Sequence, residues 1–238
     1  MKILAIECSA TACSAAILED EKIIASGFVN VKLTHSQTLM PMVEQLLKSA
    51  MTDIGEIGGF AVSVGPGSFT GIRIGISAIK GLAAPRNLPC VGVSTLRAMA
   101  ENYSDTDCIV CAVMDARCHQ VYNAIFDISG GKITRLCEDR ALMCDELAEN
   151  IKLMSQKEKK RVIIVGDGAE IFFAYVKDFD FASISAPHRR FQNAVGVGMT
   201  AIREFNNNDY QSPEELLPVY LRLPQAEREL KLKKEQGK

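Results

Sequence analysis

Two carboxylates end apolar segments at places that are typical of phosphate-handling enzymes. Glu7 closes the segment 2–7, and Asp115 closes the segment 108–115. In kinases and ATPases built from a duplicated α/β unit, acids here handle Mg²⁺ and phosphate, and a glycine two residues later lets the phosphate approach the backbone. Ser9 and Arg117 occupy those glycine places in this chain. We therefore interpret the two acids as structural ends of strands.

A glycine-rich loop, GPGSFTG at residues 65–71, joins a predicted strand to a predicted helix. Such loops present backbone N–H groups and the positive end of a helix to phosphates. This loop lacks the lysine of a P-loop and the spacing of a dinucleotide motif. We expect a tight turn in which Ser68 or Thr70 caps the helix. The alternative is a set of weak phosphate or nucleotide contacts from Glu7, Ser9, Gly67, Ser68 and Asp115.

The helix after this loop carries glycines four residues apart, Gly71 and Gly75. Each interior glycine costs about 1 kcal/mol relative to alanine, so a close approach of another backbone is expected there. That backbone belongs either to the protein's own sheet or to a helix of a partner. Isoleucines at 72, 74, 76 and 79 make the helix apolar nearly all round, and such a helix must be covered on every side. A partner helix is therefore a serious hypothesis.

Cysteine and histidine are present, but their spacing predicts no metal centre. Cys108 and Cys111 form a C-x-x-C pair on a predicted strand, where they point to opposite faces, and no second such pair exists. We interpret the eight cysteines as free, mostly buried thiols. The three histidines are scattered. His35, at the entrance of a predicted helix, could assist catalysis, but we expect it to take part in capping that helix.

The elements that must position these residues repeat once along the chain. The first half predicts strands over 2–7, 13–18 and 22–31, a helix over 36–51, a strand over 60–64, a helix over 68–84, a strand over 89–93 and a helix from 94 to 103. The second half predicts strands over 108–115, 119–128 and 132–139, a helix over 145–155, a strand over 161–165, helices over 169–177 and 191–205, an extended segment over 216–222 and a charged helical tail over 226–234.

Both halves thus read strand-strand-strand-helix-strand-helix, which predicts a duplicated, actin-like α/β architecture. We expect one subdomain over residues 1–104 and a second over 105–238.

The chain has 238 residues and a formal net charge of −2, so it lacks the basic field of an autonomous nucleic-acid binder. Basic clusters such as 157–161 are expected to be solvated surfaces. Glu7 interrupts any export signal, no apolar run is long enough to cross a membrane, and we expect a cytoplasmic protein.

Six segments together resemble the TsaB (YeaZ) family over essentially the whole chain. They are ILAIECS at 3–9, HSQ at 35–37, VGPGSFTGIRIGISAIKG at 64–81, GVSTL at 92–96, MDAR at 114–117 and PVYLR at 218–222. The resemblance implies the actin-like (ASKHA, ribonuclease H-like) fold. It also implies a non-catalytic subunit that helps to form N6-threonylcarbamoyladenosine in tRNAs reading codons that start with A.

The resemblance further implies the partners. They are a catalytic paralogue, TsaD, and an ATPase, TsaE, with tRNA reached through the complex and a homodimer when the chain is alone. No cofactor is expected on this chain alone, and ATP and metal are expected on the partner subunits. By resemblance, the two helices of the first half form the interface, for which we select Leu39, Met42, Val43, Leu46, Gly71, Ile72, Gly75, Ile76, Ile79 and Lys80.

One position pair separates this chain from the catalytic paralogue. Thr95 and Met99 stand where the paralogue has its two metal-binding histidines, and these side chains cannot replace two imidazoles. We expect no metal at this pair.

Glu7 departs from the aspartate that is common in the family. Two alternatives to an accessory subunit stay open: an autonomous ATPase or kinase of the same fold, and, less favoured, a metallopeptidase.

Overall fold

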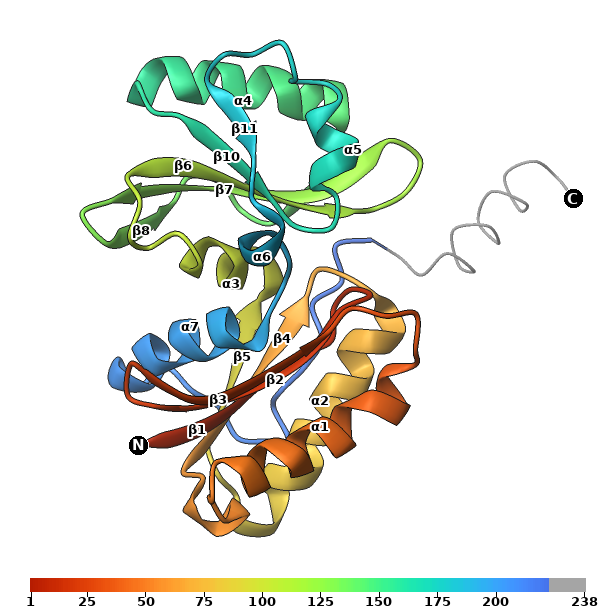
Figure 1. The fold of residues 1–238 in the computed structure, drawn as a ribbon, viewed down its shortest axis with the longest axis vertical. Helices are drawn as coiled ribbons and strands as arrows, with labels where there is room; N and C mark the ends of the chain where they lie inside the picture. Colours follow the sequence, from red (N-terminus) through yellow and green to blue (C-terminus); the bar gives the residue numbers. More distant parts are fainter. Residues whose placement is uncertain (223–238) are drawn as a thin grey trace, which may run out of the picture.

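Residues 1–222 of the protein are described by a computed structural model, in which two sheets are stacked with helices between and outside them (Figure 1). The predicted tail over 226–234 lies outside the described residues. Among residues 1–222, no helix is long and apolar enough to cross a membrane.

The first sheet has five strands in the order β3-β2-β1-β4-β5. Its strands are β1 (Lys2–Glu7), β2 (Cys13–Glu19), β3 (Lys22–Val29), β4 (Gly59–Gly65) and β5 (Cys90–Ser94). β1 pairs antiparallel with β2 and parallel with β4, which brings the ends of β1 and β4 to the same edge. The run from Ile3 to Ile6 is fully buried because helices cover both faces of the sheet.

Alternation along β1 decides which helices it contacts. Leu4 and Ile6 pack in a core with α1 (His35–Ser49) and α2 (Phe69–Ala83), whereas Ile3 and Ala5 pack in another core with α7 (Ala194–Asn206). Single turns of 3-10 helix, Ile54–Glu56 and Ala84–Arg86, follow α1 and α2. The first sheet is therefore a layer between α1 and α2 on one side and α7 on the other.

The second sheet repeats the topology of the first, with the order β11-β10-β6-β7-β8. Its elements are β6 (Cys108–Asp115), β7 (Gln120–Ser129), β8 (Lys132–Arg135), β9 (Arg140–Met143), α4 (Cys144–Glu158), β10 (Val162–Val165), α5 (Ala169–Phe173), β11 (Ala182–Ile184) and α6 (Pro187–Arg190). Read from the opposite edge, β8-β7-β6-β10-β11 matches β3-β2-β1-β4-β5 strand for strand. The predicted duplication is confirmed.

Helix α3 (Thr95–Glu101) lies between the two sheets with α7 (Figure 1). Ser94 accepts the N–H of Arg97, so the predicted cap of α3 is confirmed. The predicted division at residue 104 stays a prediction. The structure places α7, which that division assigns to the second subdomain, against β1, β2, β4 and β5 of the first sheet.

Several sequence-based boundaries were wrong. The strand predicted over 132–139 ends at Arg135, and a separate strand, β9, follows it; β8 and β9 pair with opposite ends of β7 because the chain turns between them. Arg135 stabilises that turn by bonding the Cys137 carbonyl and Asp139. The helix predicted over 169–177 ends at Phe173, and the one predicted from 191 begins at Ala194, where Asn193 caps it. β9, β11 and α6 were not predicted.

The C-x-x-C pair behaves as expected. Cys111 packs under α4 and α5, and Cys108 packs on the other face of the sheet near α3. All eight cysteines lie within the described residues and are free thiols, and only Cys118 is exposed.

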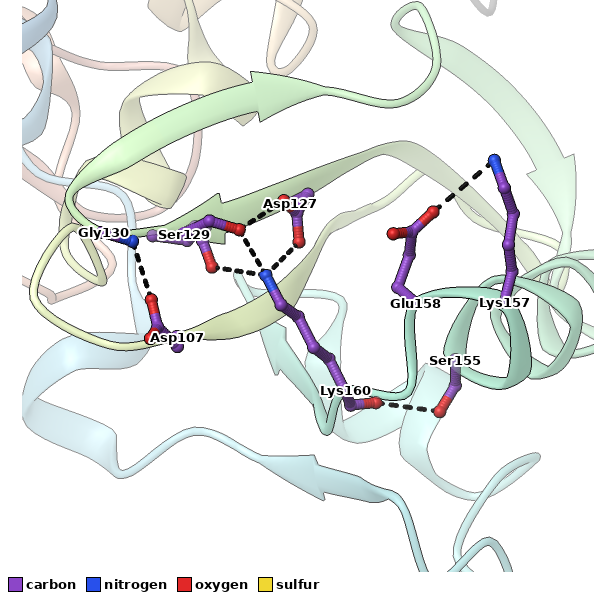
Figure 2. A network of polar contacts seen from close by, with 9 residues as sticks. Asp107, Asp127, Ser129, Gly130, Ser155, Lys157, Glu158 and Lys160 are labelled. Atoms are coloured by element: carbon purple, nitrogen blue, oxygen red, sulfur yellow. Dashed lines mark hydrogen bonds and ion pairs between the residues drawn. The ribbon is translucent and has the colours of Figure 1, made fainter.

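The basic run at 157–161 is not simply a solvated surface. Figure 2 shows Lys160 reaching the end of β7, where its Nζ donates to Asp127 at 2.6 Å, to the Ile128 carbonyl at 3.0 Å and to Ser129. Ser155 closes the connection after α4 by donating to the Lys160 carbonyl at 2.9 Å. Lys157 fits the expectation, since it is largely exposed and pairs with its neighbour Glu158. Lys160 is thus a structural residue that ties α4 to the sheet.

Candidate functional site

A cleft of about 690 Å³ opens between the two sheets, where β1, β6 and β10 end. Four of the five predicted phosphate-contact residues line it: Ser9, Gly67, Ser68 and Asp115. Glu7 lies behind Ser9 and is fully buried. The structure therefore brings the predicted residues together, although whether they contact a phosphate stays a prediction.

Glu7 and Asp115 occupy equivalent ends of β1 and β6 and make the same local turn. The Ser9 N–H donates to Glu7 at 2.5 Å, and the Arg117 N–H donates to Asp115 at 2.7 Å. Each carboxylate thus fixes the backbone two residues after the strand, which is the structural role expected from the sequence. Burial raises the pKa of Glu7, so its negative charge is disfavoured.

The turn after Asp115 adopts a backbone conformation that glycine prefers. Arg117 has a φ of +64°, in the left-handed region, and Cys118 and His119 follow with +55° and +58°. Arginine thus occupies a glycine-like conformation here at a conformational cost. Its side chain lines the cleft.

The glycine-rich loop forms the cap that the sequence predicted. Ser68 is the N-cap of α2 and accepts the Gly71 N–H at 3.2 Å, while its own N–H donates to the Ser9 carbonyl at 2.6 Å. A Cβ on Gly67 would lie 2.3 Å from that carbonyl oxygen. The loop is therefore packed against the end of β1, and two of its N–H groups are already bonded.

A third carboxylate, Asp167, enters the cleft and was missed by sequence reasoning. It follows β10 and accepts from Gln192 at 2.6 Å. Burial raises its pKa to about 6. The duplicated order of elements could have indicated this residue. Gly166-Asp167-Gly168 follows β10, the strand equivalent to β4, and so corresponds to the loop at 65–67.

The segment 218–222 closes one side of the cleft and bridges the two halves. Val219 donates its N–H to the Val64 carbonyl at 2.8 Å, and Arg222 donates to the Ala116 carbonyl at 2.8 Å. Tyr220 stacks on Phe69 with ring centroids 4.6 Å apart and accepts from Arg73 at 2.8 Å. The closing segment thus links the start of α2 to the turn after β6.

Gly71 and Gly75 of α2 face the protein's own sheet. A Cβ on Gly71 would lie 2.0 Å from the Cys8 carbonyl oxygen, and one on Gly75 would lie 3.2 Å from the Val62 side chain. Of the two explanations that the sequence left open for these glycines, packing on the chain's own strands is the one observed. A large charged residue at Gly75 would disrupt the fold, so it cannot serve as a test of partner binding.

Most of the selected interface residues are also turned inward. Eight of the ten are buried in this chain: Leu39, Val43, Leu46, Gly71, Ile72, Gly75, Ile76 and Ile79. Met42 and Lys80 are partly exposed. The interface assignment itself stays a prediction, but the side chains available to a partner are the outward-facing ones of the same two helices. On α2 these include Thr70, Arg73 and Ser77, with Ile74 partly exposed.

Thr95 and Met99 are core residues. Thr95 is fully buried, and Met99 packs with Leu96 and Tyr103 beneath the second sheet.

The prediction that His35 helps to cap α1 was wrong. Thr34 is the N-cap of that helix and makes no side-chain hydrogen bond to it. His35 instead contacts the Ala10 carbonyl at 2.8 Å.

The sequence model of a family described as "TsaD: tRNA N6-adenosine threonylcarbamoyltransferase" matches residues 29–226. The Buchnera aphidicola (subsp. Acyrthosiphon pisum) protein named "tRNA threonylcarbamoyladenosine biosynthesis protein TsaB" is 34% identical over 179 residues, or 71% of this chain and 76% of that protein. The Bacillus subtilis protein of the same name is 29% identical over 232 residues, covering 95% and 96% of the two chains. The chain belongs to the TsaB family.

A TsaB-family assignment agrees with solved structures. A crystal structure from Pseudomonas aeruginosa, of a protein described as similar to peptidase YEAZ, superposes with a TM-score of 0.76 at 26% identity, over 93% of this chain and 99% of that one. The duplicated order of strands is that of the actin-like class, as predicted. For this TsaB-family member, the cleft and the outer faces of α1 and α2 are therefore the two candidate functional surfaces.

Proposed function

We propose that this chain is a non-catalytic subunit required to form N6-threonylcarbamoyladenosine in tRNAs that read codons starting with A. It binds a TsaD-like catalytic subunit through the outer faces of α1 and α2 and activates it together with a TsaE-like ATPase. The tRNA is reached through this complex in the cytoplasm. Membership of the TsaB family supports this role.

The incomplete covering of α2 is the observation that carries the proposed mode of action. Ile72, Ile76 and Ile79 are buried in the first core, but Ile74, Ala78 and Leu82, spaced four residues apart, pack against it only in part. These three side chains form one row along the helix. A helix with apolar residues on its outer side is stabilised when a second surface covers that row.

The start of α2 adds side chains of the kind that anchor protein interfaces. A shallow groove is lined by Phe69, Thr70, Arg73, Ile74 and Ser77. Arg73 stacks over the Phe69 ring at 4.1 Å and donates to Tyr220, so its guanidinium is held in place before any partner arrives. Aromatic residues and arginine dominate binding energy at interfaces, and preorganised ones lose less entropy on binding.

The same row of residues suits a second copy of the chain. We propose that the homodimer and the complex with the catalytic subunit use one surface and compete for it. In α1, Met40 is exposed and Leu47 is partly exposed, which extends this surface beyond α2. Because both complexes occupy the same surface, a molecule in the homodimer cannot bind the catalytic subunit, and the concentrations of the two proteins set the balance.

The experiment is a titration of this chain into the purified TsaD-like subunit by calorimetry. Ile74→Glu places a charge on the outer row of α2, at a side chain that is only partly buried, and we expect at least about 30-fold weaker binding, the loss typical of an interface hot spot. Ile171→Glu is the matched control, because Ile171 is exposed on α5 of the second half. If Ile74→Glu binds as tightly as the control, the assigned face is wrong.

A further inference from the structure

Two thiols and one imidazole that lie far apart in the sequence meet behind the wall of the cleft. Cys8, Cys13 and His35 each present a ligand atom, and these atoms all lie within 4.8 Å of one another. Both cysteines are almost fully buried. We propose that this triad is a binding site for a thiophilic divalent cation, with Zn²⁺ as the expected ion.

The first sheet brings the two cysteines together. β1 and β2 pair antiparallel with Glu7 opposite Ser14, so the next residues along, Cys8 and Cys13, face each other where the strands diverge. Their Sγ atoms are 3.8 Å apart. Two thiolates on a tetrahedral Zn²⁺, with Zn–S distances of about 2.3 Å, lie about 3.8 Å apart. The observed separation therefore suits a shared ion, and it is far longer than a disulfide bond.

His35 is oriented as a metal-binding histidine usually is. Its Nε2 lies 2.8 Å from the Ala10 carbonyl oxygen, and a carbonyl can only accept, so Nε2 carries the proton. Its Nδ1 is buried and has no hydrogen-bond partner among the described residues. A ligating histidine commonly donates its other N–H to a backbone carbonyl, which fixes its tautomer. The arrangement leaves the Nδ1 lone pair available for an ion.

Packing holds the ring where it is needed. A Cβ on Gly71 would lie 3.0 Å from Cδ2 of His35, so the glycine of α2 makes room for the imidazole. The ring is thus held between the first turns of α1 and α2. Three ligands from β1, β2 and α1 would then be joined through one ion, which would fix the start of α1 to the first sheet.

The charges of the triad favour a cation. Two thiolates 3.8 Å apart in a buried place repel each other, and a divalent ion between them offsets this repulsion. Binding of the ion displaces the protons from both thiols.

Softness of the donors selects the ion. Two thiolates and one imidazole suit Zn²⁺ and exclude Mg²⁺ and Ca²⁺, which require oxygen ligands. The protein supplies three ligands, so we assign the fourth position to water. His35, Ser9 and Ala10 line the cleft, which gives an ion a route from solvent to the triad.

The test uses the full-length protein, purified with a reductant and without a metal-affinity tag. Zn²⁺ bound after dialysis is measured by elemental analysis, and Co²⁺ is titrated as a spectroscopic probe. We expect one equivalent of either ion and a thiolate-to-Co²⁺ charge-transfer band. Wild-type protein that binds neither ion, or that yields a Cys8–Cys13 disulfide and no metal, overturns the proposal.

Variants assign the site. Cys13→Ser and His35→Ala are expected to weaken Co²⁺ binding at least 100-fold and to remove or shift the charge-transfer band. Cys108→Ser and Cys111→Ser are the matched controls, since both are buried cysteines of the second sheet and outside the triad. Circular dichroism checks that each variant is folded. Equal Co²⁺ binding by Cys13→Ser and Cys111→Ser would place the ion elsewhere and contradict the assignment.

Discussion

A Cβ atom on Gly71 would lie 2.0 Å from the backbone oxygen of Cys8. No side chain fits at that distance, and the obstacle is backbone, so α2 or β1 would have to move. We therefore expect Gly71→Ala to lower the free energy of unfolding by about 3 kcal/mol, at the upper end of overpacking effects. Urea denaturation monitored by circular dichroism measures this change.

Gly81 on the same helix provides the control. Nothing lies within 4 Å of a Cβ built there, so Gly81→Ala brings only the higher helix propensity of alanine. We expect that variant to gain about 1 kcal/mol in the free energy of unfolding. Equal losses in the two variants would show that the close approach of Gly71 to Cys8 is not what constrains the helix.

Asp167 should make stability depend on pH. Burial raises its pKa to about 6 in the folded state, whereas an unfolded aspartate titrates near 3.9. Between these values the folded protein holds the extra proton, so the free energy of unfolding falls as pH rises. Asp167→Asn keeps an acceptor oxygen for Gln192 and removes the charge. We expect it to match wild type near pH 4 and to be about 1 to 3 kcal/mol more stable at pH 7; parallel pH profiles would contradict this.

Lys160 should stabilise the second sheet more than the exposed Lys157 does. Burial raises the pKa of Asp127, but the hydrogen bonds from Lys160 and Ser129 outweigh it and lower that pKa overall. Lys160→Met is expected to cost about 1 to 2 kcal/mol in the free energy of unfolding. The loss holds above the ordinary pKa of an aspartate and shrinks as pH falls through the lowered pKa of Asp127.

Lys157→Met serves as the comparison for this network (Figure 2). Lys157 is 81% exposed and pairs with Glu158 at 3.5 Å, so its removal should change the free energy of unfolding by no more than about 0.5 kcal/mol. Chemical denaturation at pH 7 and pH 4 measures both variants. Similar losses at both lysines would show that the network around Asp127 does not tie α4 to β7.

Local patterns in the sequence predicted most of the fold. Apolar runs such as 2–7 and 108–115 are buried on both faces, and Ser68 and Ser94 cap the helices that follow them, so strand and helix starts were correct there. The element order also predicted the duplication. β11 was missed because it has only three residues and pairs with β10 alone, leaving little pattern to detect.

The candidate site was less accessible to sequence reasoning, because its contacts join distant segments. The all-round apolar pattern of α2 suggested a partner, but it did not show which side the chain's own sheet covers, and Gly71 and Gly75 proved to face that sheet. Likewise, no spacing rule links Cys8 and Cys13 to His35. Only the pairing of β1 with β2 and the packing of α1 bring those three side chains together.

The most direct test of the proposed role is a reconstituted modification reaction. It measures the threonylcarbamoyl group transferred to tRNA by the TsaD-like and TsaE-like subunits, supplied with the threonylcarbamoyl-adenylate donor, with and without this chain. We predict that transfer requires this chain, that Ile171→Glu restores it fully, and that Ile74→Glu restores it only weakly at equal concentration. Full transfer in the absence of this chain, or transfer by this chain alone, would contradict the role of an activating subunit.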